Sequence, residues 1–349
     1  MKLSEYGITN QTATTGLTLA RVTALSHQQY TLVCDAGQFF AQVTGRIVNM
    51  AMDATDFPTV GDWVQVRLPQ NAQDLATIER ICNRQSVFLR KVAGRRFNAQ
   101  LVAANVDWVL SCMALDANFN LRRLERYLAV ANASGAQPAV VLTKADTTST
   151  LINQVEAVKA ITDAPVIVCD TSAAGIDTLA TFIMPGMTYA FLGSSGVGKT
   201  TLINRLLGTQ AYATNAVRIS DNHGRHTTTA RQLLRLPSGG IVIDTPGMRE
   251  LGLLEADVTT TFSDIQALAV GCRFKDCTHT NEPGCAVQAA VGDGELNADR
   301  LTSYQQLIAE QATNNQLRGK ARENEKINRM FGSKKLMKQK MKAARHKRG

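Results

Sequence analysis

The first part of the chain consists of short segments rich in β-branched and aromatic residues, separated by turn signals such as Asp35-Ala36-Gly37 and Gly61-Asp62. Five short strands in this length predict a small barrel, and an OB-fold is the leading candidate. Such barrels often bind RNA, but a fold alone does not establish a function. The predicted strands are residues 17–23, 30–34, 39–43, 62–67 and 75–81.

The pattern changes around residue 98. Residues 82–98 are polar and basic and predict a linker between domains. Beyond them, apolar runs alternate with amphipathic segments, which predicts a mostly parallel sheet covered by helices on both faces. The predicted strands are residues 106–115, 139–142, 166–169 and 188–192, and the predicted helices are residues 121–133, 151–161 and 201–207. A further helix is predicted at residues 298–328, with Leu301, Tyr304, Leu307 and Ile308 on one side.

The segment that follows the strand at residues 188–192 fits G-x-x-x-x-G-K-[ST], the phosphate-binding P-loop. Its glycines let successive backbone N–H groups point at an anion, and the helix after it adds its positive end. Lys199 would contact the β- and γ-phosphates, and Thr200 would bind Mg²⁺. A glycine-rich turn can match by chance, but the flanking strand and helix favour a nucleotide site. The predicted phosphate-binding residues are Gly193, Ser194, Ser195, Gly196, Val197, Gly198, Lys199, Thr200 and Thr201.

Two earlier strands end in motifs typical of guanine recognition. Asp146 would accept hydrogen bonds from the guanine N1–H and N2 amine, whereas adenine offers no matching donors. The stem of Lys144 would lie along the base. Taken alone, each motif is more typical of an exposed turn, but the first follows a buried strand in a chain with a P-loop. The residues concerned are Thr143, Lys144, Ala145 and Asp146, which resemble [NT]-K-x-D, and Ser172 and Ala173, which resemble the [ST]-A loop near the guanine O6.

A polar segment after the P-loop, residues 215–230, has the composition of a mobile loop. In GTPases a threonine of such a loop coordinates Mg²⁺, and Thr228 and Thr229 are favoured here. A hairpin is predicted from residues 232–236 and 241–243. Its second strand leads into a D-x-x-G motif, in which Asp244 would reach Mg²⁺ and the N–H of Gly247 would reach the γ-phosphate.

These motifs occur in an unusual order: the guanine motifs come first, then the P-loop, the threonine loop and D-x-x-G. A conventional small GTPase begins with the P-loop and ends with the guanine motifs. The order therefore predicts a circular permutation, which is possible where the termini of the parent fold lie close together.

Three of the seven cysteines are clustered with a histidine in the spacing C-x4-C-x-H-x5-C. Four soft ligands match a closed structural Zn²⁺ site, and a catalytic site would need an open coordination position. A disulfide conflicts with the reducing compartment expected below. The predicted ligands are Cys272, Cys277, His279 and Cys285, whereas Cys34, Cys82, Cys112 and Cys169 stand singly in apolar surroundings and are predicted to be buried.

The chain has 349 residues, 44% of them hydrophobic, and a net charge of +9. Its length predicts two or three domains. From Arg318 onward there are 13 basic residues and two acidic ones, so the excess charge belongs to the tail and suggests a polyanionic partner. A purely solubilising tail is the alternative. No apolar run reaches transmembrane length and the start is polar, so we expect a cytoplasmic protein that does not associate with a membrane.

Arg46, Arg67 and Arg80 of the predicted barrel are candidates for phosphate contacts, with an ordinary solvated face as an equal alternative.

With the barrel, the permuted motifs, the Cys₃His spacing and the basic tail in one order, the chain resembles the RsgA (YjeQ) family of GTPases that depend on the small ribosomal subunit. The resemblance implies an OB-fold domain at residues 1–85, a permuted GTPase domain at residues 86–255, and a mostly helical zinc domain with the basic tail at residues 256–349. It further implies hydrolysis of GTP to GDP and phosphate, stimulated by the small subunit, in the late maturation of that subunit. The expected partners are that subunit, its rRNA and GTP or GDP, and we expect a monomer.

Two positions depart from common GTPase patterns. Thr143 stands where asparagine is commoner, so we expect weaker nucleotide binding with guanine selectivity retained by Asp146. Met248 stands where Ras-like enzymes have a water-positioning glutamine, so intrinsic hydrolysis should be slow. His226 is a candidate to position the water, with a solvated loop histidine as the alternative. A GTP-controlled RNA-binding scaffold with incidental hydrolysis remains the alternative function, and a P-loop ATPase is disfavoured by Asp146.

Overall fold

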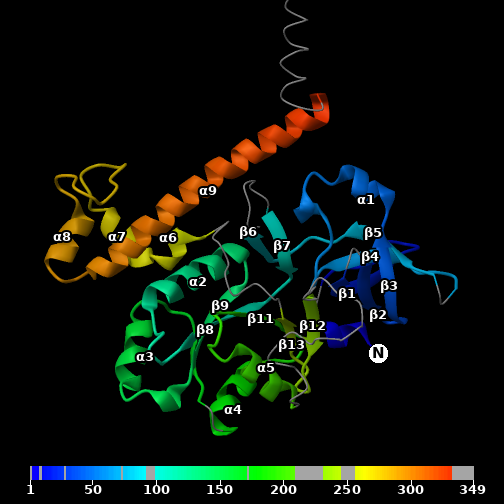
Figure 1. The fold of residues 1–349 in the computed structure, drawn as a ribbon, viewed down its shortest axis with the longest axis horizontal. Coiled ribbons are helices and arrows are strands. Elements are labelled where there is room, and N and C mark those ends of the chain that lie inside the picture. The colour runs from blue at the N-terminus through cyan, green and yellow to red at the C-terminus, as the bar shows by residue number, and fades with distance from the viewer. Residues whose placement is uncertain are drawn as a thin grey trace, which may run out of the picture.

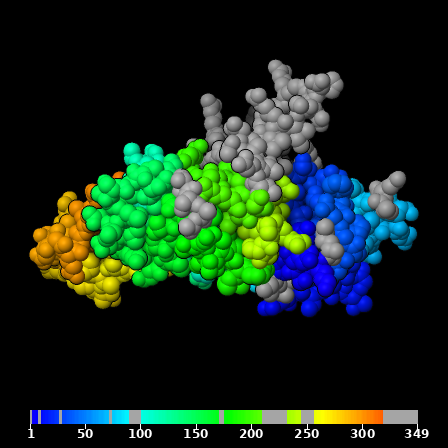
Figure 2. Space-filling model, turned by 90° about the horizontal axis from the view of Figure 1, so that it is seen from below, coloured from blue at the N-terminus to red at the C-terminus, as the bar shows by residue number. Residues whose placement is uncertain are grey.

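The computed structural model of the chain describes residues 2–7, 10–26, 29–71, 74–91, 99–170, 173–208, 231–244 and 256–331, and of residues 318–331 only the backbone. The molecule is elongated, with a barrel at one end, a central sheet covered by helices, and a helical part at the other end (Figure 1). Figure 2 shows the same order from another side. The three parts are the predicted fold class: barrel, α/β sheet and helical C-terminal part.

The barrel is formed by five strands that correspond to the five predicted β-rich segments. Strand β1 pairs with β2 on one edge and with β4 on the other, and β3 pairs in parallel with β5. The order β1-β2-β3-β5-β4 therefore closes on itself around a core that includes Val22, Val64 and Ile78. The elements are β1 (Thr18–Ser26), β2 (Gln29–Cys34), β3 (Gly37–Val43), β4 (Trp63–Arg67), β5 (Ala76–Ile81), helix α1 (Gly45–Met50) and 3-10 helices at Leu3–Tyr6 and Ala54–Asp56.

The central sheet runs in the order β10-β9-β8-β11-β13-β12, and all its strands are parallel except β12. Side chains of one strand alternate between two cores, because successive residues of a strand face opposite sides. Val109 and Met113 of β8 pack with helices α2 and α3, whereas Leu110 packs with α4 and α5. The elements are β8 (Trp108–Ala114), α2 (Leu121–Ser134), β9 (Gln137–Thr143), a 3-10 helix (Ala145–Thr147), α3 (Leu151–Lys159), β10 (Val166–Val168), α4 (Ala173–Phe182), β11 (Thr188–Leu192), α5 (Lys199–Leu207), β12 (Arg231–Arg235) and β13 (Ile241–Asp244).

The interpretation of residues 82–98 as a linker is wrong for part of this segment. Residues Val87–Lys91 form strand β6, which pairs antiparallel with β7 (Ala99–Ala104) in a separate two-stranded sheet. The physical reason is Phe88, whose side chain is 1% exposed and packs in the core shared with α2. The basic residues around this short apolar run concealed it in the sequence.

The barrel and the central sheet are joined through strand β1. After its pairing with β4, β1 continues and pairs with β12 at Ala24 and Leu25, so the two parts form one sheet of eleven strands. Arg21 of β1 is fully buried at this junction. Its guanidinium donates to the carbonyl oxygens of Gly61 and Asn105 and to the hydroxyl of Thr188 at 2.9 Å, which links β1 to the start of β11. Burial lowers the pKa of Arg21 to about 10, so it remains charged at neutral pH.

The C-terminal part consists of short helices packed on one long helix. Helix α9 confirms the predicted helix, and Leu301, Tyr304 and Leu307 are buried on one side of it, although Ile308 is exposed. The elements are α6 (Val258–Thr261), α7 (Ser263–Ala269), α8 (Ala286–Gly292) and α9 (Ala298–Phe331). Among the helices of the described ranges, none combines the length and apolar character needed to cross a bilayer. Cys34, Cys82, Cys112 and Cys169 are buried, as expected.

Candidate nucleotide and metal sites

The predicted nucleotide-binding segments meet at one edge of the central sheet. Strands β10, β9, β8, β11 and β13 are parallel neighbours, so the segments that follow them leave at the same edge. In an open α/β sheet, this edge is where ligands bind. The P-loop follows β11, the guanine motif begins at the end of β9, and Asp244 is the last residue of β13. The permuted chain order thus leaves these segments neighbours in space.

The P-loop conformation requires its first glycine. Gly193 has a φ of +153°, and a Cβ at this position would lie 2.7 Å from the carbonyl oxygen of Cys112 on β8. Gly196 and Gly198 have left-handed φ values of +79° and +97°. Lys199, the first residue of α5, donates from Nζ to the carbonyl oxygen of Ser194 at 2.6 Å. Its ammonium group therefore lies over the loop, on the side where P-loop lysines bind phosphate.

The guanine motif is held by two side-chain contacts. The hydroxyl of Thr143 donates to the carbonyl oxygen of Val197 in the P-loop at 2.6 Å. Lys144 has a left-handed φ of +58°, and its Nζ forms an ion pair with Asp116 Oδ2 at 2.8 Å. This contact lowers the pKa of the Asp116 carboxyl. Asp146 lies in the 3-10 helix that follows. The backbone N–H of Ala145 donates to the carbonyl oxygen of Cys169, just after β10, so the two guanine segments are adjacent.

Asp116 is the residue that the sequence reasoning missed. It follows β8, which lies between β9 and β11, so it emerges at the same edge as the motifs. The available signal was a third buried strand followed by the polar residues Asp116 and Asn118. No general sequence motif marks this position.

Several predicted residues lie outside the described residues: Ser172, His226, Thr228, Thr229, Gly247 and Met248. Ala173 begins α4 and Asp244 ends β13, and only their backbones are placed. Their roles stay predictions. Thr200 and Thr201 lie in the first turn of α5, directly after the P-loop.

The four predicted metal ligands do come together. One ligand atom from each of Cys272, Cys277, His279 and Cys285 lies within 4.8 Å of the other three. Cys272 Sγ is 3.6 Å from His279 Nδ1 and 3.9 Å from Cys285 Sγ, and His279 Nδ1 is 3.4 Å from Cys285 Sγ. Burial lowers the pKa of His279, which favours the neutral imidazole that a metal ion needs. This cluster could hold a metal ion.

The neighbouring helices hold the ligand loop in place. His279 has a left-handed φ of +57°, which is rare for a residue with a side chain. Its carbonyl oxygen accepts hydrogen bonds from Gln288 Nε2 of α8 at 2.7 Å and from Gln305 Nε2 of α9 at 2.8 Å. Cys285 caps α8, since its Sγ accepts from the N–H of Gln288. The helices of this part are therefore organised around the cluster.

Helix α2 connects the central sheet to the C-terminal part. Arg300 of α9 donates from Nη1 to Glu125 Oε1 of α2 at 2.8 Å, and its Nε and Nη2 bind Asp264 at 2.6 and 2.8 Å. Its guanidinium also lies over the ring of Phe262. Burial raises the pKa of Glu125, against the opposing attraction of Arg300. Asn132 adds a hydrogen bond to Thr261. These contacts fix α2 against the helices that surround the metal cluster.

The three barrel arginines proposed for phosphate contacts line one cavity of about 730 Å³, beside α1. Arg67 forms an exposed ion pair with Glu79, at 3.4 Å. Within the described ranges, no carboxylate forms an ion pair with Arg46 or Arg80, and all three arginines are exposed. The structure thus groups the three arginines on one exposed surface.

Comparisons with known proteins agree with this arrangement. A family model described as RsgA GTPase matches residues 81–254. Small ribosomal subunit biogenesis GTPase RsgA 2 of Lactiplantibacillus plantarum is 46% identical over 345 residues, which is 97% of each chain. Small ribosomal subunit biogenesis GTPase RsgA of Opitutus terrae is 47% identical over 306 residues, which is 84% of this chain and 83% of the relative.

Two solved structures share the fold. YjeQ from Thermotoga maritima has a TM-score of 0.63 at 22% identity, with 85% of this chain and 99% of that chain covered. YloQ, described as a circularly permuted GTPase, has a TM-score of 0.58 at 23% identity, with 85% and 96% covered. At these identities the two structures are evidence for the fold alone. They support the permuted arrangement of the central sheet.

Proposed function

Since this chain belongs to the RsgA GTPase family, whose members are hydrolases acting on GTP, we propose that it acts in the late maturation of the small ribosomal subunit. The subunit stimulates hydrolysis of GTP to GDP and phosphate. The observation that supports a single nucleotide site is the hydrogen bond from Thr143 to Val197, which joins the guanine motif to the phosphate loop. Two motifs far apart in the sequence thereby form one site.

In this proposal, the base is bound by residues 143–146 together with Ser172 and Ala173, and the phosphates by residues 193–201 and Gly247. Thr200 and Asp244 are the residues that would hold Mg²⁺, with Thr228 or Thr229 from the threonine loop. When bound, the ion neutralises charge on the β- and γ-phosphate oxygens. The ends of β11 and β13, which are hydrogen-bonded neighbours, support this assignment.

For the water attack, His226 is the proposed positioning group, since the thioether of Met248 cannot orient a water. The reaction without a partner should therefore be slow, about 10⁻⁴ to 10⁻² s⁻¹ as in unassisted GTPases. His226→Ala should abolish the stimulated turnover and spare GTP binding. Unchanged stimulation would reject this role for His226.

We propose zinc as the ion of the Cys₃His cluster. Tetrahedral Zn²⁺ with bonds of about 2.3 Å to sulfur and about 2.0 Å to nitrogen separates its ligand atoms by about 3.5 to 3.8 Å. Three of the ligand separations, 3.4, 3.6 and 3.9 Å, lie near this range, and all four ligand atoms lie within 4.8 Å of one another, which supports this ion. Four protein ligands leave no position for substrate, so the proposed role is structural.

We further propose that the chain divides at residues 85 and 255 and that the protein is a cytoplasmic monomer. The barrel and the basic tail would contact rRNA. The tail's excess of basic residues and the cavity with Arg46, Arg67 and Arg80 support this contact. Because phosphate contacts release counterions, the affinity for the subunit should fall steeply as salt rises.

The test measures turnover of GTP and of ATP by the full chain, with and without small ribosomal subunits, across a salt series. Stimulation that is specific for GTP and lost at high salt is the expected result. Subunit binding without any stimulation would favour a GTP-controlled RNA-binding scaffold with incidental hydrolysis, which the missing glutamine keeps as the second candidate.

A further inference from the structure

Helix α2 carries three arginines near its start, and they have different surroundings. Arg122 pairs with Asp299 and Arg126 pairs with Glu310, both on α9. In the part of the chain that the structure describes, no carboxylate lies within ion-pair distance of Arg123. Two of the three charges therefore serve the contact with the C-terminal part, and the third is available to another anion.

Arg123 lies against the P-loop. Its Nη1 is 3.5 Å from Ser194 Oγ, a distance at the limit of a hydrogen bond. The backbone carbonyl oxygen of the same serine accepts a hydrogen bond from the ammonium group of Lys199, at 2.6 Å. Two cations from different elements thus converge on Ser194. The lysine of a P-loop binds the β- and γ-phosphates. Because Arg123 and Lys199 lie on the same serine, Arg123 lies beside the proposed phosphate site.

The position along the loop identifies which phosphate is nearest. The guanine motif approaches the P-loop at Val197, where Thr143 donates its hydrogen bond. Ser194 lies three residues earlier, at the end of the loop that holds the ammonium of Lys199. Arg123 is therefore at the end of the site remote from the base motif, where the terminal phosphate of a nucleoside triphosphate lies.

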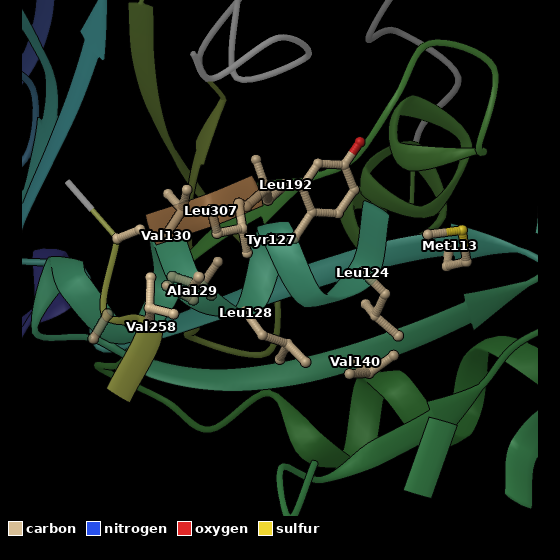
Figure 3. Close-up of a cluster of buried hydrophobic side chains, with 14 of the residues drawn as sticks. Met113, Leu124, Tyr127, Leu128, Ala129, Val130, Val140, Leu192, Val258 and Leu307 are labelled. Carbon is tan, nitrogen blue, oxygen red and sulfur yellow. The ribbon is translucent and has the colours of Figure 1, made fainter. Parts of the chain in front are cut away.

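The helix that carries Arg123 is held firmly. Asn120 caps it by accepting from the N–H of Arg123 itself at 3.0 Å. Leu124, Tyr127 and Leu128 are buried beneath it, and Figure 3 shows the ring of Tyr127 beside Leu192, the last residue of β11. Two residues after Arg123, Glu125 is bound by Arg300 of α9. The backbone of Arg123 is thus preorganised, and only its half-buried side chain needs to turn toward a ligand.

We propose that Arg123 contacts the terminal phosphate of GTP and stabilises the charge that develops there during hydrolysis, as a second cation beside Lys199. This inference rests on the proposed function. An arginine suits the role because its guanidinium is always charged and matches phosphate oxygens with two parallel N–H donors. An arginine supplied by a partner protein accelerates other GTPases by about 10³- to 10⁵-fold. Here the group comes from the chain itself.

The first test compares binding of GDP with binding of a non-hydrolysable GTP analogue, GppNHp, to the full chain with Mg²⁺. Arg123→Ala should weaken GppNHp about tenfold relative to GDP, because only the analogue has the terminal phosphate, and charged hydrogen bonds are worth at least that factor. Arg123→Lys should keep part of the preference, since it keeps the charge without the paired donors. Arg122→Ala, on the same turn of the helix, should keep the wild-type preference.

The second test measures kcat and KM with saturating small subunits. Arg123→Ala should lower kcat at least about tenfold with a smaller change in KM, because a contact that strengthens in the transition state acts on kcat. If Arg123→Ala leaves the ratio of the GppNHp and GDP affinities unchanged, whether or not both affinities fall, the proposal is overturned. Thermal melting of Arg123→Ala and Arg123→Lys separates these results from misfolding. The binding test does not require turnover, so it remains decisive if the wild-type protein shows no stimulation and the proposed function itself fails.

Discussion

The hydroxyl of Thr143 donates a hydrogen bond of 2.6 Å to the backbone carbonyl oxygen of Val197. Threonine therefore supplies the link between guanine motif and P-loop that an asparagine can make in other GTPases. Both residues are buried, so an unpaired carbonyl at Val197 would cost free energy. Nucleotide binding should depend on this single hydroxyl.

Thr143→Val should weaken GDP and GTP to a similar degree, by about five- to a hundredfold, since an orphaned buried acceptor costs about 1–3 kcal/mol. Titration with a fluorescent guanine nucleotide measures this change. Thr148→Val is the matched control, because the hydroxyl of this half-buried residue forms its hydrogen bonds, among the described residues, with the neighbouring Thr150. Equal affinities for Thr143→Val and the wild-type protein would show that the two loops hold their positions without the bond.

Asp146→Asn should reverse the base preference from guanine toward xanthine. The carboxylate accepts from two guanine N–H groups, whereas an amide can accept one bond and donate another to the xanthine O2. We expect a loss of GTP affinity of at least about a hundredfold, because sites built for hydrogen bonding discriminate strongly. Competition between GTP and XTP for the protein measures the preference. An unaltered preference would refute the guanine assignment.

The pair between Lys144 and Asp116 should help to hold Lys144 along the base. Asp116→Asn should weaken guanine nucleotides by about two- to fivefold, since partly exposed ion pairs contribute about 1 kcal/mol or less. The hydrogen bond from Lys144 lowers the pKa of Asp116 below its ordinary 3.8, so this contribution is present at neutral pH and is lost only as pH falls through the lowered pKa. The affinity difference between wild type and Asp116→Asn should stay constant above about pH 5 and shrink below pH 4.

Removal of Arg300 should destabilise the chain by about 3–5 kcal/mol, because it takes away the ion-pair partner of the buried Glu125 carboxylate. Chemical denaturation of Arg300→Ala measures this loss. Arg122→Ala should cost about 1 kcal/mol or less, since its pair with Asp299 is largely exposed.

The pH dependence of Arg300→Ala supplies a second check. Burial already raises the pKa of Glu125, and without Arg300 the folded pKa should rise further. A carboxyl group with a raised folded pKa stabilises the folded state below its unfolded value, and this stability is lost as pH rises through the folded pKa. The defect of Arg300→Ala should therefore be smaller in mild acid than at neutral pH. A defect that does not change with pH would contradict the role given to Glu125.

Loss of the metal should unfold the surroundings of the cluster and leave the nucleotide site intact. Cys272→Ser should reduce bound zinc from one equivalent to none, and α7 and α8 should lose hydrogen-exchange protection, while α5 keeps it. Cys34→Ala, at a buried cysteine of the barrel, should retain the metal. Full protection of α8 in Cys272→Ser would mean that packing on α9 suffices without the ion.

The parallel strands were predictable because each contains an apolar run, and residues 188–192 coincide with the fully buried strand β11. The ligand cluster was predictable because its spacing is short. Several other elements were not: β6 owes its position to the buried Phe88, and α6 to α8 have no more than seven residues each and depend on tertiary packing. Contacts between distant residues were also beyond the sequence. Thr143 and Val197 are 54 positions apart, and Arg300 and Glu125 are 175 apart.

Strand β1 divides one of its edges between the barrel strand β4 and the central strand β12. Together with the bonds of Arg21 to Asn105 and Thr188, this shared strand ties the described part of the barrel directly to the sheet that carries the P-loop. A partner that binds the barrel would therefore also fix the orientation of the nucleotide phosphates relative to itself. Docking and orientation of the reaction centre are a single event in such a molecule, and a partner can bring its own groups to the nucleotide without touching the base.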